Sequence, residues 1–429
     1  MEEKTSIKKY NTFNFLLVTI LCIIFLTRYL NERIPRQIQV VAVVFLMICS
    51  IPNLFSLLRK SFIHFKLISC VFAISSIILL YYILGYSTAA SGNYFSQVVF
   101  FLCIYIAMIS GEYMSQKQKM YFIIALLSVA TINLCYNVII NIIYPNASYQ
   151  TLSLRKGWHS ELEGLAIGAT GFNTFALLFF NICFFLFLNC QSKKYKMTFL
   201  ILSGLSVYYI YLGQRGSVTL FMVLSIFLLL YTKEKKNGRR RKFIPVVFLI
   251  LIFIVCIIFS EEILKLLMLI FPSERLQIRF NSLLETLNTG VNEESFTGRY
   301  RLYWVSIDSF FSSLQSVLIG IGDHRTEVSD FAATGIGGHS ELLDSLARYG
   351  LLGFSFITII YISVYQLTNN FFKGLRGQGQ IKYIFLIFIL YSMFKVVFTP
   401  IIGISIFIML PFASEILKMD QCYQFTSDR

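Results

Sequence analysis

Long apolar runs recur along almost the whole chain, and most are long enough to cross a lipid bilayer. Phe65–Tyr86 and Gly171–Cys190 are two of them, and a helix needs roughly 20 apolar residues to span the hydrocarbon core. Only helices and closed barrels satisfy their backbone polar groups inside a membrane. The runs are continuous instead of alternating, so they predict helices. The composition agrees, because 56% of the 429 residues are hydrophobic and only 14% are charged.

These runs predict an all-α integral membrane protein with about 12 transmembrane helices. The predicted spans are Asn11–Leu30, Gln37–Phe55, Phe65–Tyr86, Phe95–Tyr113, Lys119–Tyr144, Gly171–Cys190, Lys196–Leu212, Ser217–Tyr231, Phe243–Ser260, Leu346–Leu367, Lys382–Phe398 and Ile401–Leu417. The last two are divided at Thr399-Pro400, and the alternative for them is a single re-entrant pair.

The net charge of +15 could indicate a nucleic-acid partner, but its distribution favours another explanation. Cytoplasmic loops of membrane proteins are enriched in Lys and Arg. If the basic N-terminal segment is cytoplasmic, every second turn, including the run Lys233–Lys242, falls on the same side. We therefore expect both termini in the cytoplasm, anionic membrane lipids as partners of the basic run, and no nucleic acid.

The nine cysteines lie in predicted spans or at their cytoplasmic ends. None lies in a large outer loop, so the sequence predicts neither a disulfide framework nor a metal site.

The predicted topology divides the chain into three regions. Residues 1–260 hold the first nine transmembrane helices and an outer loop at 145–170, residues 261–345 form a large extracytoplasmic loop, and residues 346–429 hold the last transmembrane helices and a cytoplasmic tail. A loop as long as the second one usually has structure of its own. Apolar residues recur at helical spacing from Arg299 to Leu314, which predicts an amphipathic helix at the outer membrane interface.

Arginine and lysine separate across the predicted membrane. The outer segments contain eleven Arg and three Lys, whereas the inner ones contain mostly Lys. Arg binds phosphate or carboxylate with a planar fork and does not lose its proton, so the outer face is suited to hold an anion. The alternative is that these Arg residues pair with acidic residues of the same loop. Arg215, in the short outer turn GQRGS, is a functional candidate; snorkelling to the interface is the alternative.

His339 is the candidate for acid–base chemistry. It follows a glycine pair and precedes a predicted helix whose first turn contains Glu341 and Asp344. Histidine exchanges a proton near neutral pH, and a nearby carboxylate can orient its ring. The other outer histidines, His159 and His324, lie in loop sequence where simple solvation is the ordinary explanation.

Four motifs carry a family resemblance. They are TGRYRLYW at 297–304, VLIGIG at 317–322, GGHSELLDSLARYGLLG at 337–353, and the GQRG turn around Arg215. Their order and the two large outer loops resemble the O-antigen polymerase and O-antigen ligase superfamily. Within it, the chain is most similar to the capsular or exopolysaccharide repeat-unit polymerases of the Wzy type. The resemblance covers the second half of the chain, and the first five spans match only in being hydrophobic.

The resemblance implies a GT-C-like polytopic glycosyltransferase at the outer face of the bacterial cytoplasmic membrane. Its donor would be an oligosaccharide on polyprenyl (undecaprenyl) diphosphate, with flippase and chain-length regulator proteins as partners. Arg215 and Arg299 would bind the diphosphate, with Arg155 and Arg301 as further candidates. His339 would activate the acceptor hydroxyl, supported by Glu341, Asp344 and Trp304. The resemblance implies no metal and no cofactor, and direct attack at the anomeric carbon would invert its configuration.

Two rival functions remain open on the sequence. A ligase would transfer a finished glycan once, onto a different acceptor, and the shared motifs do not separate it from a polymerase. A flippase or transporter of the lipid-linked saccharide would also have about 12 spans. Transporters place charged residues in mid-membrane, whereas here only Lys395 falls clearly inside a predicted span.

Overall fold

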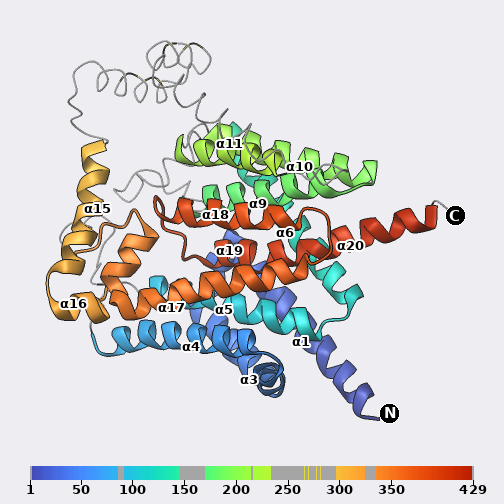
Figure 1. The fold of residues 1–429 in the computed structure, drawn as a ribbon, viewed down its shortest axis with the longest axis horizontal. Helices are drawn as coiled ribbons and strands as arrows, with labels where there is room; N and C mark the ends of the chain where they lie inside the picture. Colours follow the sequence, from blue (N-terminus) through green and yellow to red (C-terminus); the bar gives the residue numbers. More distant parts are fainter. Residues whose placement is uncertain are drawn as a thin grey trace.

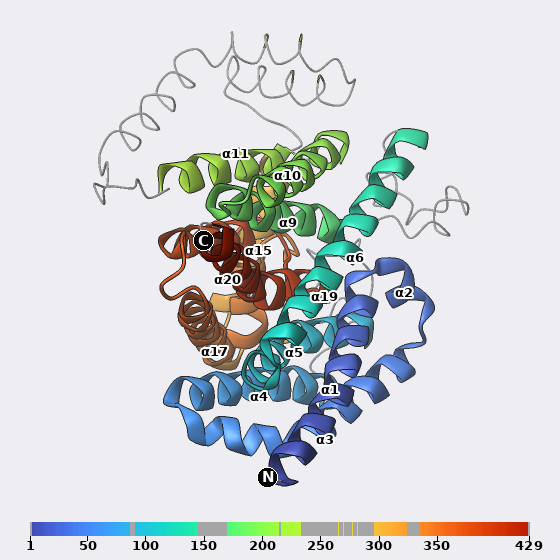
Figure 2. The ribbon, with the colours of Figure 1, turned by 90° about the vertical axis from the view of Figure 1, so that its right-hand side faces the viewer.

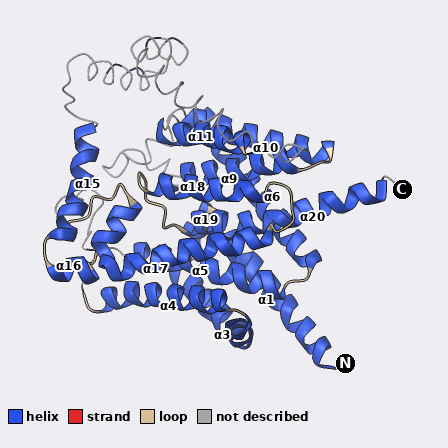
Figure 3. Ribbon diagram, in the orientation of Figure 1, coloured by secondary structure: helices blue, strands red, loops and turns tan. Residues whose placement is uncertain are grey.

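The structure is a computed structural model, and it describes residues 2–85, 91–144, 170–213, 216–232, 296–323 and 335–427, with the single residues 265, 269, 277 and 281. Over these ranges the chain consists of helices and the turns that join them, without strands (Figures 1 and 3). The predicted ninth span, Phe243–Ser260, lies outside the described residues.

The first half contributes eight helices in the described ranges: α1 (Glu2–Leu26), α2 (Arg28–Arg33), α3 (Arg36–Lys60), α4 (Phe62–Ile83), α5 (Ser91–Tyr113), α6 (Gln116–Ile143), α9 (Thr170–Asn189) and α10 (Lys193–Gly213). The second half contributes α11 (Gly216–Tyr231), α15 (Phe296–Phe311), α16 (Leu314–Ile319), α17 (Glu341–Phe371), the 3-10 turn η2 (Gln378–Gln380), α18 (Ile381–Ser392), α19 (Pro400–Gly403), the π-helical segment η3 (Ile404–Met409) and α20 (Leu410–Ser427).

Among the described residues, eight helical stretches are long and apolar enough to cross a membrane, which agrees with the prediction of an all-α membrane protein. They are Arg36–Arg59, Phe62–Ile83, Tyr94–Tyr113, Gln116–Ile143, Gly171–Asn189, Lys193–Gly213, Glu341–Phe371 and Pro400–Cys422. Thr12–Leu26 and Ser217–Tyr231 are apolar but shorter. The predicted span Lys382–Phe398 is different in the structure, because α18 ends at Ser392 and residues 393–399 are not helical. Lys395 therefore lies in a break between helices and not inside a span.

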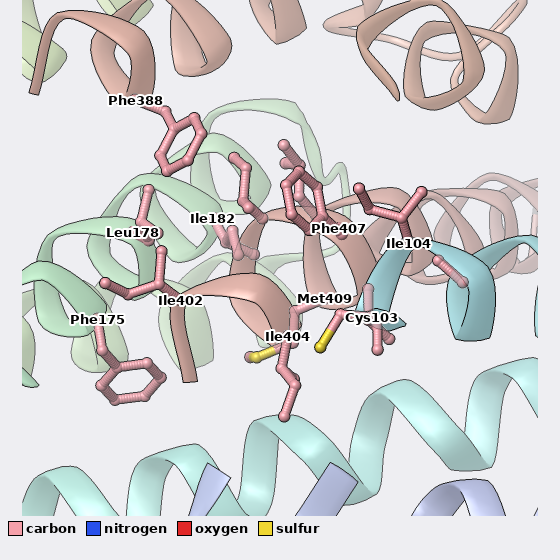
Figure 4. Close-up of a cluster of buried hydrophobic side chains, with 14 of the residues drawn as sticks. Cys103, Ile104, Phe175, Leu178, Ile182, Phe388, Ile402, Ile404, Phe407 and Met409 are labelled. Carbon is pink, nitrogen blue, oxygen red and sulfur yellow. The ribbon is translucent and has the colours of Figure 1, made fainter. Parts of the chain in front are cut away.

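The last membrane-spanning stretch lies at the centre of the bundle. The apolar window of Pro400–Cys422 is 94% buried, whereas that of Arg36–Arg59 is only 17% buried and leaves its apolar side chains for lipid. α5, α6, α9 and α17 pack around the central stretch (Figure 2). Ile402, Phe407 and Met409 pack there against Cys103 of α5 and Leu178 of α9 (Figure 4). Aliphatic and aromatic side chains therefore hold the bundle together.

Helices α15 and α16 lie across one end of the bundle, against the beginning of α17 (Figure 1). The predicted amphipathic helix is confirmed as a helix, α15. Ser306 and Phe310 face the bundle and are buried, whereas Trp304 is 49% exposed and Phe311 is 71% exposed. Part of the apolar stripe is thus left outside the protein core. We call this end, which also carries His339, the His339 end.

Two motif glycines let α16 and α17 approach at backbone distance. A Cβ on Gly320 would lie 2.2 Å from the carbonyl oxygen of Arg348, and one on Gly350 would lie 2.5 Å from the carbonyl carbon of Leu318. Gly350 also has φ +60°, which interrupts α17. The interruption leaves carbonyl groups of the preceding turn without their helical donors. The N–H groups of Ile321 and Gly322 donate to the carbonyls of Ala347 and Arg348, at 2.9 and 3.1 Å.

Candidate functional site

A fully buried arginine lies at the His339 end, surrounded by three carboxylates. Arg348 Nε is 3.2 Å from Asp323 Oδ2, Nη1 is 3.2 Å from Glu341 Oε1, and Nη2 is 3.8 Å from Asp344 Oδ2. All four side chains are at most 2% exposed. We call these four residues the Arg348 cluster.

Helical register brings three members of the cluster together. Glu341, Asp344 and Arg348 are separated by three and four residues, which places them on one face of α17. Ser340 begins the helix, and its hydroxyl accepts the N–H of Leu343 at 3.2 Å. Two acidic residues in the first turn also suit the partial positive charge of a helix N-terminus. Asp323 comes from the turn after α16, so the cluster joins two segments of the chain.

Glu341 also binds the break between α18 and α19. Its Oε2 accepts the N–H groups of Val397 and Phe398, at 2.8 and 3.0 Å. Its own N–H donates to the carbonyl of Lys395 at 3.3 Å. Non-helical backbone within a membrane protein needs such partners because lipid supplies none. The carboxylate of Glu341 therefore fixes residues 395–398 against the start of α17.

Asp344 and Ser306 join α15 to the start of α17. Ser306 Oγ donates to Asp344 Oδ1 at 2.7 Å and accepts the N–H of Gly337 at 2.9 Å. A Cβ on Gly337 would lie 1.9 Å from the carbonyl oxygen of Leu302, so only glycine fits this turn. The turn that leads to His339 is thus packed directly on α15.

Helix α5 supports the cluster from the first half of the chain. Tyr94 donates its hydroxyl to the carbonyl of Asp323 at 3.0 Å. Tyr349, next to Arg348, donates its hydroxyl to Gln97 Oε1. The site is therefore built on helices of both halves, although the sequence motifs lie in the second.

One guanidinium faces three carboxylates in this cluster, and neutral N–H and O–H groups donate further hydrogen bonds to two of these carboxylates. The N–H groups of Val397 and Phe398 stabilise Glu341, and the hydroxyl of Ser306 stabilises Asp344. Removing one partner of a buried ion pair leaves the other charged and unsolvated. The cluster therefore joins α17 to the segments that flank it, and the turn that carries His339 is one of them.

The structure brings some of the predicted site residues together. His339 is partly buried in the turn before α17, two residues before Glu341. The carboxylates of Glu341 and Asp344 both interact with Arg348, which lies on the same face of α17. Arg301 and Trp304 lie on the exposed side of α15. Arg299 is in the same helix, two turns before Ser306. Arg155 and Arg215 lie outside the described residues.

Sequence reasoning missed Arg348 and Asp323 as members of the site. Arg348 had a signal, because an arginine four residues after Asp344 and seven after Glu341 shares a helix face with both. The sequence contains no such signal for Asp323, because its position beside Arg348 depends on the packing of α16 against α17.

In the part of the chain that the structure describes, no group of three or more His, Cys, Asp and Glu side chains could hold a metal ion. The expectation of a metal-free reaction stays a prediction.

No family model matches the chain, and no curated protein matches it either. The family resemblance therefore depends on the motifs of the chain itself.

Proposed function

We propose that the protein is a glycosyltransferase that polymerises polyprenyl-diphosphate-linked oligosaccharide repeat units into a surface polysaccharide, such as a capsule, exopolysaccharide or O-antigen. One observation carries the proposal. The three motif segments of the second half, 297–304, 317–322 and 337–353, pack against one another around the Arg348 cluster. Segments that resemble one enzyme superfamily thus meet at a single end of the bundle.

In the proposed reaction, His339 accepts the proton of a sugar hydroxyl on the acceptor. That oxygen attacks the anomeric carbon of the donor, the bond from this carbon to the phosphate oxygen breaks, and the polyprenyl diphosphate leaves with the bonding electron pair. Arginine side chains stabilise the charge that grows on the diphosphate; Arg215 and Arg299 are the first candidates, with Arg155 and Arg301 after them. Attack from the opposite face inverts the anomeric carbon.

The proposal includes a topology. About 12 spans, a GT-C-like arrangement and cytoplasmic termini place the His339 end at the outer face of a bacterial cytoplasmic membrane. The exposed Trp304 and Phe311 on α15 then lie at the lipid interface, where aromatic side chains are favoured. A lipid-linked donor moving in the outer leaflet would reach His339 at this level.

The test is a polymerisation assay on the purified protein in nanodiscs. Lipid-diphosphate-linked repeat units from the same strain are added with EDTA, and the products are separated on a gel. We expect a ladder of evenly spaced products from the wild type and none from His339→Ala. His64→Gln is the matched control. His64 is in the first turn of α4, whereas Tyr81, near the other end of that helix, donates its hydroxyl to the carbonyl of Ile319 at the His339 end. Replacing His64 should therefore leave the ladder intact.

Other outcomes identify the rival functions. A single transfer to a different acceptor, without a ladder, identifies a ligase. Saccharide carried across the bilayer of proteoliposomes, without new glycosidic bonds, identifies a transporter and contradicts the proposal. Retention of the anomeric configuration in the product, measured by NMR, would contradict direct attack.

A further inference from the structure

Helix α15 holds the turn that carries His339 along one of its faces. Gly335 and Gly337 come just before His339, and both lie directly against α15. A Cβ on Gly337 would lie 1.9 Å from the carbonyl oxygen of Leu302, and a Cβ on Gly335 would lie 2.7 Å from Ser309 Oγ. Leu302 and Ser309 are seven residues apart in the helix, which places them on one face, two turns from each other.

Ser306 lies on the same face of α15, between these two contacts, and is 1% exposed. Its hydroxyl accepts the N–H of Gly337 at 2.9 Å and donates to Asp344 Oδ1 at 2.7 Å. The direction of both bonds follows from the partners, because a backbone N–H only donates and an ionised carboxylate only accepts. One hydroxyl therefore joins the backbone before His339 to the helix after it.

The helix after His339 has further attachments of its own. Ser340 begins α17 and accepts the N–H of Leu343, and Asp344 Oδ2 lies 3.8 Å from Arg348 Nη2. His339 is thus in a short segment that is attached at both ends, two residues before it and five residues after it. Both attachments meet at the hydroxyl of Ser306. Such precision matters for a catalytic group, because a misplacement of about 1 Å can cost a hundredfold in rate.

We propose that Ser306 is a positioning residue for His339. Its hydroxyl ties the turn to α17 and so holds the imidazole where it accepts the proton of the acceptor sugar. This role deepens the proposed function and rests on it for the reaction that His339 performs. Ser306 acts through the turn and not on the substrate. Without its hydroxyl, the buried N–H of Gly337 and Oδ1 of Asp344 lose a shared partner, and the segment between them is free to shift.

The kinetic test is the polymerisation assay on Ser306→Ala in nanodiscs. We expect kcat to fall about tenfold to a hundredfold. KM should stay within about twofold, because the groups that bind the donor are unchanged. Ser306→Thr keeps the hydroxyl and should restore most of the lost kcat.

Ser309→Ala is the matched control for this loss. It is the same substitution one turn later on the same face of α15. The hydroxyl of Ser309 lies against Gly335 but, within the described ranges, forms no hydrogen bond with the turn. Ser309→Ala should therefore keep the wild-type kcat. A folded Ser306→Ala protein with the wild-type kcat, or an equal loss in Ser309→Ala, overturns the inference.

A second measurement follows His339 without any substrate. Diethyl pyrocarbonate is added to the protein in nanodiscs, and carbethoxylation of His339 is followed by peptide mass spectrometry. The wild type should react slowly, because His339 is partly buried. Ser306→Ala should react faster, and amide hydrogen exchange in the peptide that contains Gly337 should accelerate with it. Ser309→Ala and Ser306→Thr should react as the wild type does. Unchanged rates in Ser306→Ala contradict the inference.

Thermal unfolding shows whether each variant is folded. If Ser306→Ala does not fold, Ser306→Cys takes its place, because a thiol is a weaker donor and acceptor than a hydroxyl. An intermediate loss of kcat, with faster modification of His339, is then expected. Wild-type values of both in Ser306→Cys would contradict the inference.

The two experiments together separate this inference from the proposed function. If the wild type makes a ladder and Ser306→Ala makes it at the same rate, the inference fails and the proposed function stands. If the wild type makes no ladder, but Ser306→Ala exposes His339 to modification and Ser309→Ala does not, Ser306 holds His339 in place and the proposed function fails.

Discussion

At the scale of single residues, Arg348 determines how the His339 end is built. Its guanidinium is the partner of three buried carboxylates, and these carboxylates hold α15, α16 and the 393–399 segment. Arginine suits this place because it stays protonated and offers five N–H donors in a fixed plane. Lysine would supply the charge but could not reach all three acids with the same geometry.

Replacing Arg348 by methionine should therefore destabilise the fold, because it leaves three acids buried without their cation. We expect a loss of about 3–5 kcal/mol in the free energy of unfolding, measured by chemical denaturation in detergent. Arg301→Met, at an exposed position of α15, should change it by less than about 0.5 kcal/mol. Equal stability of the two variants would show that the guanidinium does not pair with the buried acids.

At the scale of helices, α16 and α17 meet through backbone contact at Gly320 and Gly350. Gly320 has φ +83°, and its Cα faces the carbonyl of Arg348. The contact places Asp323 within reach of Arg348, because Asp323 follows Gly320 by three residues. The tight turn and the ion pair therefore depend on each other.

Gly320→Ala should cost about 3 kcal/mol, since it combines a clash with a backbone angle that side chains disfavour. Gly204→Ala in α10 is the control, because nothing lies within 4 Å of a Cβ there; it should be neutral or slightly stabilising. Thermal unfolding of both variants measures the difference. A Gly320→Ala protein as stable as the control would mean that α16 can move away from α17.

The sequence predicts helices better than it predicts their interruptions. The apolar stripe around Tyr303 and Trp304 correctly predicts α15, and continuous apolar runs correctly predict most of the bundle. The run that contains Lys395 also looks like a helix, yet it is broken, because Glu341 supplies hydrogen bonds from 56 residues away in the chain. Apolar composition predicts that a segment is buried. It does not predict a hydrogen-bond partner so distant along the chain, which only the folded structure shows.

At the scale of the whole molecule, the two ends of the bundle should face different compartments. The proposed topology places Arg301 outside and Cys422 in the cytoplasm; the side chains at both positions are exposed. In whole cells, or in spheroplasts if a cell wall blocks access, a membrane-impermeant maleimide should label Arg301→Cys and leave Cys422 unlabelled until the membrane is opened. Two proteins are made: in one Arg301→Cys is the single cysteine, and in the other Cys422 is. Labelling of Cys422 in sealed cells would invert the topology.

The buried position of the Pro400–Cys422 stretch has a consequence for biosynthesis. Ribosomes release this stretch after all the helices that enclose it, since α5, α6, α9 and α17 precede it in the chain. The earlier helices must therefore wait in the bilayer without their centre, and lipid or a chaperone has to cover the faces that the stretch will later occupy. Assembly is completed from the inside, when this stretch enters the bundle, and a ribosome stalled before residue 400 leaves a shell that quality-control proteases can recognise.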